Sequence, residues 1–208
     1  MKKLGVLLSL SFLAVLAGGN ALAQTTAVGD GSVYFTTYFS NGNTSGATDA
    51  VLRIVNDGDA STTQVEGVPN GTLYASIYVL NDSQEMQECC SCPVTADGLL
   101  SESVNKQLTA NTLTGREEES RGVIKVISSL SGDPTANVLK AGLRGWMTHV
   151  QGNRNIPEAG PFYVTEAKWA DSNLGAAEQS SLQDTCAFII TLGSGYGICS
   201  CTLEDYDY

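Results

Sequence analysis

The six cysteines of this 208-residue chain form two groups about a hundred residues apart, and this grouping restricts the fold more than any other feature. Three lie in the stretch "ECCSC" and three lie near the C-terminus: Cys89, Cys90, Cys92, Cys186, Cys199 and Cys201. Bonds within a group fit poorly, because a disulfide needs Cα atoms about 5.5–6 Å apart and adjacent side chains of a strand point to opposite faces. Bonds between the groups leave six of the 15 possible pairings.

The N-terminus predicts export. Residues 1–3 are a short basic region, residues 4–16 are apolar, and residues 21–23 (Ala-Leu-Ala) form a small-residue cleavage site. The apolar run is shorter than the roughly 20 residues of a membrane span. We therefore expect residues 1–23 to be a bacterial signal peptide. We expect residues 24–208 to be one secreted domain, extracellular or periplasmic and not inserted in the membrane.

In an oxidising compartment, six cysteines predict three disulfides. Each bond between the groups would close a loop of roughly 100 residues, worth several kcal/mol in the chain-entropy model. A thiolate metal site at Cys90, Cys92, Cys199 and Cys201 is an alternative, although C-x-C spacing is less typical of zinc than C-x-x-C. A redox switch is a further alternative, for which C-x-x-C spacing is again the usual pattern.

Two motifs carry a resemblance. Residues 77–115, 122–129 and 174–199 resemble a group of uncharacterised secreted bacterial proteins, and this likeness includes the stretches "ECCSCPVTADG" (88–98) and "GSGYGIC" (193–199). The proteins of this group share an E-C-C-x-C-P-x-T-x-x-G motif and a C-terminal G-S-G-[YF]-G-x-C motif. The resemblance implies one continuous domain and brings no activity with it.

Most of the chain alternates apolar and polar residues with period 2, which indicates short strands between Gly, Asn and Asp turns. The predicted strands are 32–40, 50–59, 72–82, 85–90, 99–105, 121–129, 142–151 and 162–170. This pattern predicts a mainly β fold, an immunoglobulin-like β-sandwich of about 7–9 strands. The disulfides would join one C-terminal α-helix to the sandwich.

The last third of the chain changes to a helical period. Apolar residues recur at intervals of three to five, which predicts a helix over about 175–191. Asn173 is the expected N-cap and Gly193 the expected C-cap. The high β propensity of residues 188–191 leaves an alternative, in which the helix ends near Asp184 and a strand follows. The glycines of 193–197 are expected to permit positive φ angles and a close approach to the cysteines.

The charge of the chain excludes some partners. The formal net charge is −11, and removal of residues 1–23 would make it −13, because that segment holds two lysines and no acidic residue. Nucleic acids and anionic lipids both require Lys and Arg to neutralise phosphate. We expect neither as a partner.

The sequence shows no complete catalytic motif, and we expect no cofactor. His149 is the single histidine, and we expect it to be a half-buried strand residue. "GSGYG" is neither a nucleophile elbow nor a phosphate loop. A glycoside hydrolase would need two carboxylates about 5–10 Å apart. The candidates for such a pair are Glu85, Glu88, Glu166 and Asp171.

Two groups of residues are weak candidates for ligand binding. Asp57 and Asp59 could bind calcium, but "NDGD" between strands is more typical of a turn. Aromatic residues on predicted strands could stack on a sugar if exposed, whereas a sandwich of this size favours core or mixed burial. These residues are Tyr34, Tyr38, Tyr74, Tyr78, Trp146 and Trp169.

The function favoured by these observations is an exported, non-enzymatic structural, cell-surface or adhesion module stabilised by disulfides. We expect self-association through an edge strand, and strand 32–40 is the candidate. The alternative is a carbohydrate-binding protein or a carboxylate-based glycoside hydrolase.

Overall fold

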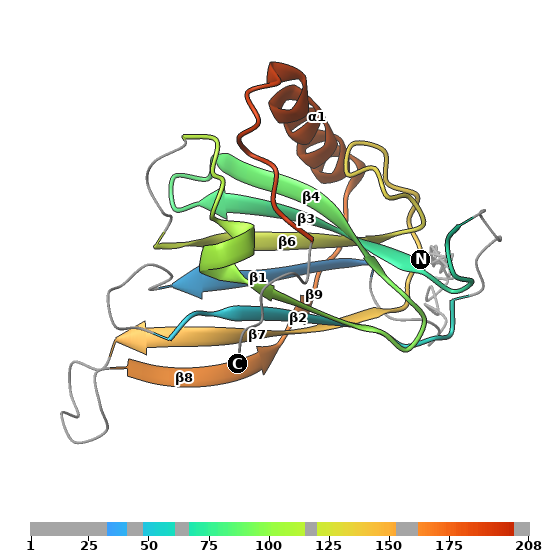
Figure 1. Ribbon diagram of the computed structural model, residues 1–208, viewed down its shortest axis with the longest axis horizontal. Coiled ribbons are helices and arrows are strands. Elements are labelled where there is room, and N and C mark those ends of the chain that lie inside the picture. Colours follow the sequence, from blue (N-terminus) through green and yellow to red (C-terminus); the bar gives the residue numbers. More distant parts are fainter. Residues whose placement is uncertain (1–32, 41–47, 61–66, 115–119, 153–161, 202–208) are drawn as a thin grey trace, which may run out of the picture.

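The computed structural model describes residues 33–40, 48–60, 67–114, 120–152 and 162–201, which form two antiparallel β-sheets and a C-terminal helix (Figure 1). The elements are β1 (Tyr34–Ser40), β2 (Val51–Asn56), β3 (Leu73–Asn81), β4 (Met86–Val94), β5 (Leu99–Ser103), a short π-helical turn η1 (Val104–Leu108), β6 (Arg121–Ser129), β7 (Leu143–Gly152), β8 (Phe162–Lys168), β9 (Ala170–Asp171) and α1 (Ala176–Leu192). Each segment predicted as a strand overlaps one of these strands, although β4 extends four residues beyond the predicted 85–90 and β7 one residue beyond 142–151. The predicted signal peptide, 1–23, lies outside the described residues.

The two sheets enclose the main core. The larger sheet has the strand order β4-β3-β6-β1-β9 and the smaller has the order β5-β2-β7-β8. Ile77 and Ile124 of the larger sheet are buried in one cluster with Leu52 and Met147 of the smaller. The prediction of a mainly β, sandwich-like architecture is confirmed. Among the described residues, no helix is both long and apolar enough to cross a membrane.

The larger sheet is covered on its second face by α1 (Figure 1). Tyr78 of β3 and Ile127 of β6 are buried there with Leu182, Cys186 and Ile189 of the helix. Alternate residues of β3 therefore serve two cores, because successive side chains of a strand point to opposite faces. The result is three layers, with the larger sheet in the middle.

The helix extends to Leu192, so the alternative in which it ends near Asp184 is wrong. Leu182, Cys186 and Ile189 recur at helical spacing and are all buried against the sheet. Their burial outweighs the β propensity of the segment. Gly193 is the C-cap, as predicted, with φ 60°. The N-cap is Gly175 and not Asn173, and it makes no side-chain capping bond.

Strand β1 is not the free sheet edge expected for residues 32–40. It pairs with β6 along its whole length and with β9 at Phe35 and Thr36. The chain leaves the smaller sheet after β8 and adds β9 beside β1. This crossing covers part of β1, which local sequence patterns could not predict.

Trp169 lies at this crossing between the sheets. It is 4% exposed, and its ring centroid is 5.2 Å from that of Phe35. A Cβ at Gly145 would lie 2.2 Å from ring atoms of Trp169, so only glycine allows the indole to rest on β7. The backbone N–H of Trp169 donates to the Gly145 carbonyl at 2.9 Å. Trp146, also on β7, is only half-buried.

Replacing Trp169 should therefore destabilise the fold more than replacing Trp146. We expect Trp169→Ala to lower the free energy of unfolding by about 3–5 kcal/mol, because it leaves a cavity between the sheets. Trp146→Ala is the matched control and should cost clearly less. Equilibrium denaturation in urea measures both, and equal losses would contradict the role assigned to Trp169.

Candidate functional site

The most elaborate local structure is a ladder of three disulfides along β4. The bonds are Cys89–Cys186, Cys90–Cys199 and Cys92–Cys201. The prediction that every bond joins the two groups is confirmed, and the pairing follows sequence order. Cys89 faces α1, whereas Cys90 and Cys92 face the sandwich core. This division follows from the alternation of side chains along a strand.

The segment after α1 lies beside β4 and covers its edge. The Cys89 N–H donates to the Gly197 carbonyl at 2.9 Å, and the Cys199 N–H donates to the Cys89 carbonyl at 3.3 Å. Gly197 has φ 83°, and a Cβ there would lie 2.4 Å from Cγ2 of Ile189. The prediction that these glycines permit positive φ and a close approach is confirmed.

The three bonds do not contribute equal chain entropy, although each spans about 100 residues of sequence. Once Cys89–Cys186 closes the long loop, Cys90–Cys199 closes an added ring of only about 14 residues, and Cys92–Cys201 one of about six. The chain-entropy model assigns them about 5, 3 and 2 kcal/mol in that order. The expectation that each bond spans roughly 100 residues is confirmed, but the three contributions to chain entropy are not independent.

All six cysteines are paired, which corrects the alternative of a thiolate metal site in this state of the protein. Among the described residues, one group of His, Cys, Asp or Glu side chains is close enough to hold a metal ion. It consists of Cys90, Cys92 and Cys201, whose sulfurs are engaged in disulfides.

The carboxylates proposed for a hydrolase do not meet in one cleft. Glu88 on β4 and Asp171 on β9 belong to opposite edges of the larger sheet. Four strand spacings separate these edges, or about 19 Å. Glu166 lies in the smaller sheet and pairs with Arg53 at 2.8 Å. Glu85 is exposed in the turn before β4, whereas Glu88 is fully buried. The hydrolase arrangement is therefore not assembled.

Two buried carboxylates are unusual, and the sequence had not indicated their burial. Glu88 accepts a hydrogen bond from the Asn111 N–H at 2.8 Å with one oxygen only. Glu102 on β5 has no hydrogen-bond partner for either oxygen among the described residues. Burial raises the pKa of Glu88 to about 7 and that of Glu102 to about 8. Both side chains therefore favour the neutral, protonated form inside the fold.

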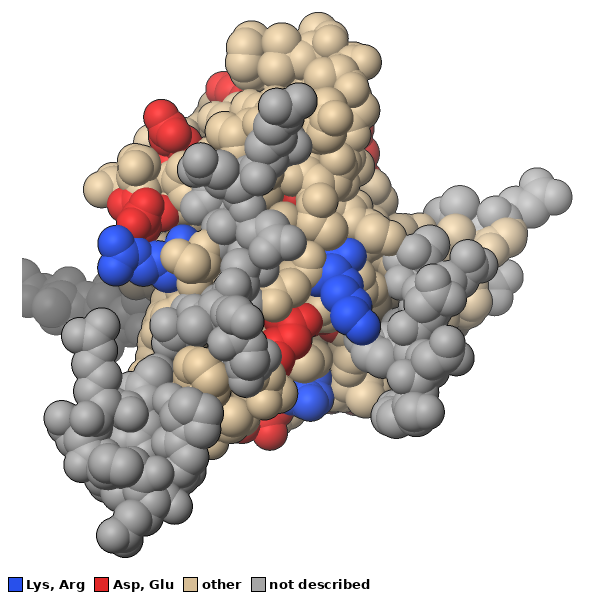
Figure 2. All heavy atoms as spheres, turned by 60° about the vertical axis from the view of Figure 1, so that its left-hand side comes forward, with Lys and Arg blue, Asp and Glu red and all other residues tan. Residues whose placement is uncertain are grey.

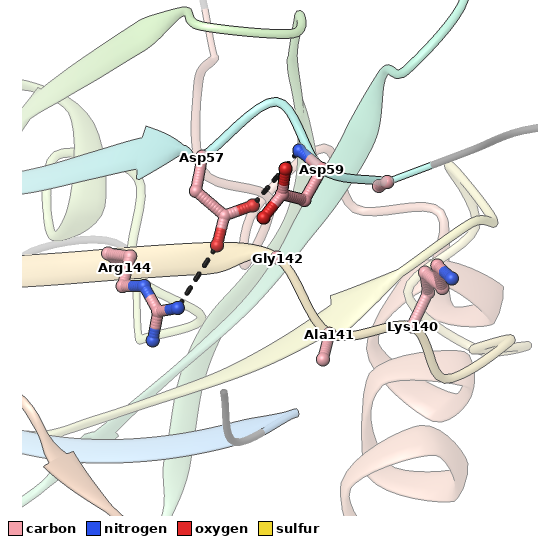
Figure 3. Close-up of a pocket in the computed structure, with 7 residues that line it drawn as sticks. Asp57, Asp59, Lys140, Ala141, Gly142 and Arg144 are labelled. Atoms are coloured by element: carbon pink, nitrogen blue, oxygen red, sulfur yellow. Dashed lines mark hydrogen bonds and ion pairs between the residues drawn. The ribbon is translucent and has the colours of Figure 1, made fainter. Parts of the chain in front are cut away.

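Asp57 and Asp59 line a small cavity of about 90 Å³ together with Lys140 and Arg144 (Figure 3). An oxygen of Asp57 lies 3.2 Å from the Arg144 guanidinium, and its other oxygen accepts from the Asp59 N–H at 3.4 Å. Calcium requires six to eight oxygen ligands, and two cations beside the aspartates oppose it. Gly58 has φ 79°, as a tight turn requires. The geometry supports a turn here and not a calcium site.

The aromatic candidates have mixed burial, as predicted. Tyr34 and Tyr78 are buried beneath α1, where Tyr34 donates to Glu178 at 2.9 Å and Tyr78 donates to the Pro134 carbonyl at 2.6 Å. Their burial raises the pKa of both hydroxyls well above the usual value. Tyr74 is half-buried. These three do not form an exposed platform.

Tyr38 is different, because it is 45% exposed beside a shallow depression of about 310 Å³. The depression lies where β1 and β3 end and β6 begins, at the left of Figure 1. It is lined by Tyr38, Phe39, Ser40, Asn81, Asp82, Gln84, Arg121, Gly122 and Val123. Arg121 and Asp82 form an ion pair at 2.8 Å on its rim. Figure 2 shows this side of the molecule, where charges of both signs are scattered over an otherwise uncharged surface.

The ring of Tyr38 is held in place by β7. It stacks on His149 with 4.1 Å between ring centroids, and the Gln151 amide donates to its hydroxyl at 3.1 Å. His149 is on a strand, as predicted, but it is buried and not half-buried, because Tyr38 covers it. Burial lowers the pKa of His149, so the imidazole is neutral near neutral pH.

Comparison with protein-family models, with curated proteins and with solved structures finds no match to this chain. Its function must therefore be inferred from the residues and geometry described above.

The buried carboxylates predict that stability falls as pH rises. A glutamate in the unfolded chain loses its proton near pH 4.5, whereas buried Glu102 retains it to about pH 8. Between these values the folded state binds more protons, so the free energy of unfolding decreases with pH. We expect Glu102→Gln to melt roughly 10 °C above the unchanged protein at pH 9 and close to it at pH 5. A pKa raised from 4.5 to about 8 corresponds to roughly 4 kcal/mol, and about 1 kcal/mol shifts the Tm by about 2–4 °C.

Differential scanning calorimetry across this pH range measures the effect. Glu85→Gln is the control, because Glu85 is exposed. If Glu102→Gln keeps the full slope of Tm against pH, the burial of a protonated Glu102 is contradicted.

Proposed function

We propose that this protein is an exported, non-enzymatic structural module of a cell surface or extracellular assembly, and that two copies associate through β8. Its three disulfides support the export, because such bonds persist in oxidising compartments. They also support a structural role, because they hold the C-terminal segment to the sheet. An immunoglobulin-like topology with about 7–9 strands remains part of this proposal.

The exposed edge of β8 is the observation that carries the proposal. β8 ends the strand order of the smaller sheet and pairs with β7 alone among the described strands. Neighbouring residues on it are both exposed, with Tyr163 at 37% and Val164 at 52%. Both faces of this strand therefore reach the surface. An edge strand of this kind offers unpaired backbone groups to a further strand.

A second copy of β8 complements the first. Antiparallel pairing centred on Thr165 uses the whole strand and places Val164 opposite Glu166 of the other copy. It also places Phe162 opposite Lys168. No two like charges face each other in this register, whereas like charges directly opposite would destabilise the pair. The net charge of −11 opposes association at low salt, so added salt should strengthen it.

The register makes a specific prediction for Val164. Val164→Glu places like charges opposite each other at two symmetric positions, and we expect at least about a tenfold weaker dimer. Val164→Lys places opposite charges there, and the dimer should persist or tighten. Val138→Glu is the matched control, since Val138 is 54% exposed outside the strands. Sedimentation velocity over a range of protein concentrations measures all four proteins.

Two results would contradict this assembly. One is a monomer at every concentration and salt level. The other is a dimer that survives Val164→Glu but dissociates on Phe188→Glu. That outcome would place the contact on the C-terminal half of α1, which is uncharged at the top of Figure 2 and exposes Phe188, Ile190 and Leu192.

Carbohydrate binding is a second proposal, and the depression beside Tyr38 favours it. An exposed aromatic ring there adjoins amide, carboxylate and guanidinium groups from Asn81, Asp82, Gln84 and Arg121. Sugars are bound by this combination, because the ring contacts the apolar C–H face while polar groups accept and donate hydrogen bonds to hydroxyls. The stacking on His149 restricts the ring before any ligand arrives.

A glycan array followed by calorimetric titration tests this proposal. We expect Tyr38→Ala to weaken binding of any sugar found by at least about tenfold, because the stacking surface is lost. Tyr196→Ala is the control, because Tyr196 is exposed to nearly the same degree, 47%. An array without a hit, or equal binding by both variants, would contradict the proposal.

A further inference from the structure

Three sulfur atoms from two neighbouring disulfides, those of Cys90, Cys92 and Cys201, form a compact group beside the sandwich core. Cys90 and Cys92 lie two residues apart on β4, so their side chains share a face. Their sulfurs are 3.8 Å apart. The sulfurs of Cys90, Cys92 and Cys201 all lie within 4.8 Å of one another, and Cys199 is bonded to Cys90.

The separation of the Cys90 and Cys92 sulfurs, 3.8 Å, matches one edge of a tetrahedral thiolate site. Zinc binds cysteine sulfur at about 2.3 Å, and the edges of a tetrahedron with that radius are about 3.8 Å long. Cys90 and Cys92 already have this separation. The remaining two ligands would come from Cys199 and Cys201, which move away from their partners when the S–S bonds are broken.

The rest of the structure keeps these two cysteines close to β4. The buried side chains of Leu182 and Ile189 hold α1 against the larger sheet on the opposite face of the strand, with or without the Cys89–Cys186 bond. The backbone hydrogen bonds between Cys89 and residues 197 and 199 hold the following segment without any help from the other two disulfides. Four thiols would therefore remain near one another after reduction.

One of the two disulfides is also accessible. Cys201 is partly exposed, whereas Cys90, Cys92 and Cys199 are buried. Cys92–Cys201 closes the smallest added ring of the ladder, so opening it releases the least chain entropy. Reduction therefore has a starting point at the outer end of the ladder.

We propose that reduction of Cys90–Cys199 and Cys92–Cys201 converts this end of the ladder into a tetrathiolate site for Zn²⁺. A dithiol or phosphine reductant supplies two electrons to each disulfide, and two protons are taken up with them, which yields four thiols. Zn²⁺ then binds four thiolates and releases four protons. The same four cysteines are thus linked in either of two ways, by two disulfides in the oxidised protein or by one Zn²⁺ in the reduced protein.

Cobalt provides a direct test, because Co²⁺ in a tetrahedral thiolate site has thiolate charge-transfer and ligand-field absorption bands. The full chain is reduced anaerobically with a phosphine and titrated first with Co²⁺ and then with Zn²⁺. We expect one Co²⁺ per chain with the tetrahedral spectrum, and its complete displacement by Zn²⁺. Absence of these bands in the reduced protein would overturn the proposal.

Paired substitutions identify the ligands. Cys89→Ser with Cys186→Ser leaves all four proposed ligands and should keep the spectrum. Cys92→Ser with Cys201→Ser removes two ligands and should weaken Co²⁺ binding by about a hundredfold or more. The opposite pattern would assign the metal to other thiols and refute the site.

Alkylation of the unchanged protein gives an answer that does not depend on how the variants fold. After reduction, Zn²⁺ should protect Cys90, Cys92, Cys199 and Cys201 from iodoacetamide, as read by peptide mass spectrometry. Equal labelling of these four with and without Zn²⁺ would refute the proposal.

Discussion

The structure depends on the attachment of the C-terminal segment to β4. This strand presents cysteines to both of its faces, so one strand can be bonded to α1 on one side and to the following segment on the other. The backbone of 197–199 also pairs with Cys89, which covers the edge of β4 at that residue. Without this attachment, the outer face of the larger sheet would lose its cover.

Burial of the larger sheet on both faces explains several features that are otherwise unrelated. Tyr34 and Tyr78 become core residues beneath α1 and bond their hydroxyls to Glu178 and to the Pro134 carbonyl. Glu178 also pairs with Lys125 at 2.5 Å, which joins the first turn of α1 to β6. Among the described residues, nothing covers β8 of the smaller sheet in this way, and that strand also ends the strand order of its sheet.

The same compactness has an energetic cost at two glutamates. Glu88 and Glu102 are fully buried, and for Glu102 no hydrogen bond to the described residues offsets the lost hydration. Disulfides destabilise the unfolded state and therefore increase stability at every pH. The buried carboxyls have the opposite effect at high pH, because the free energy of unfolding decreases as the unfolded chain loses their protons. The disulfide ladder thus makes it easier for the fold to tolerate protonated carboxyls inside.

The sequence alone determined the period of each segment and the chemistry available to it. Alternation of apolar and polar residues predicted the strand segments, and the spacing of Leu182, Cys186 and Ile189 predicted the helix. The grouping of the cysteines predicted bonds between the two groups. All three predictions succeeded because they depend on local geometry. Tertiary structure decided which of the six disulfide pairings forms and that β1 lies inside its sheet. It also decided that Glu102 is buried and that, of the four tyrosines considered as ligand-binding candidates, Tyr38 alone is exposed beside a depression. These outcomes depend on which strands become neighbours and which face the helix covers. Such contacts join residues far apart in the chain, and no local pattern specifies them.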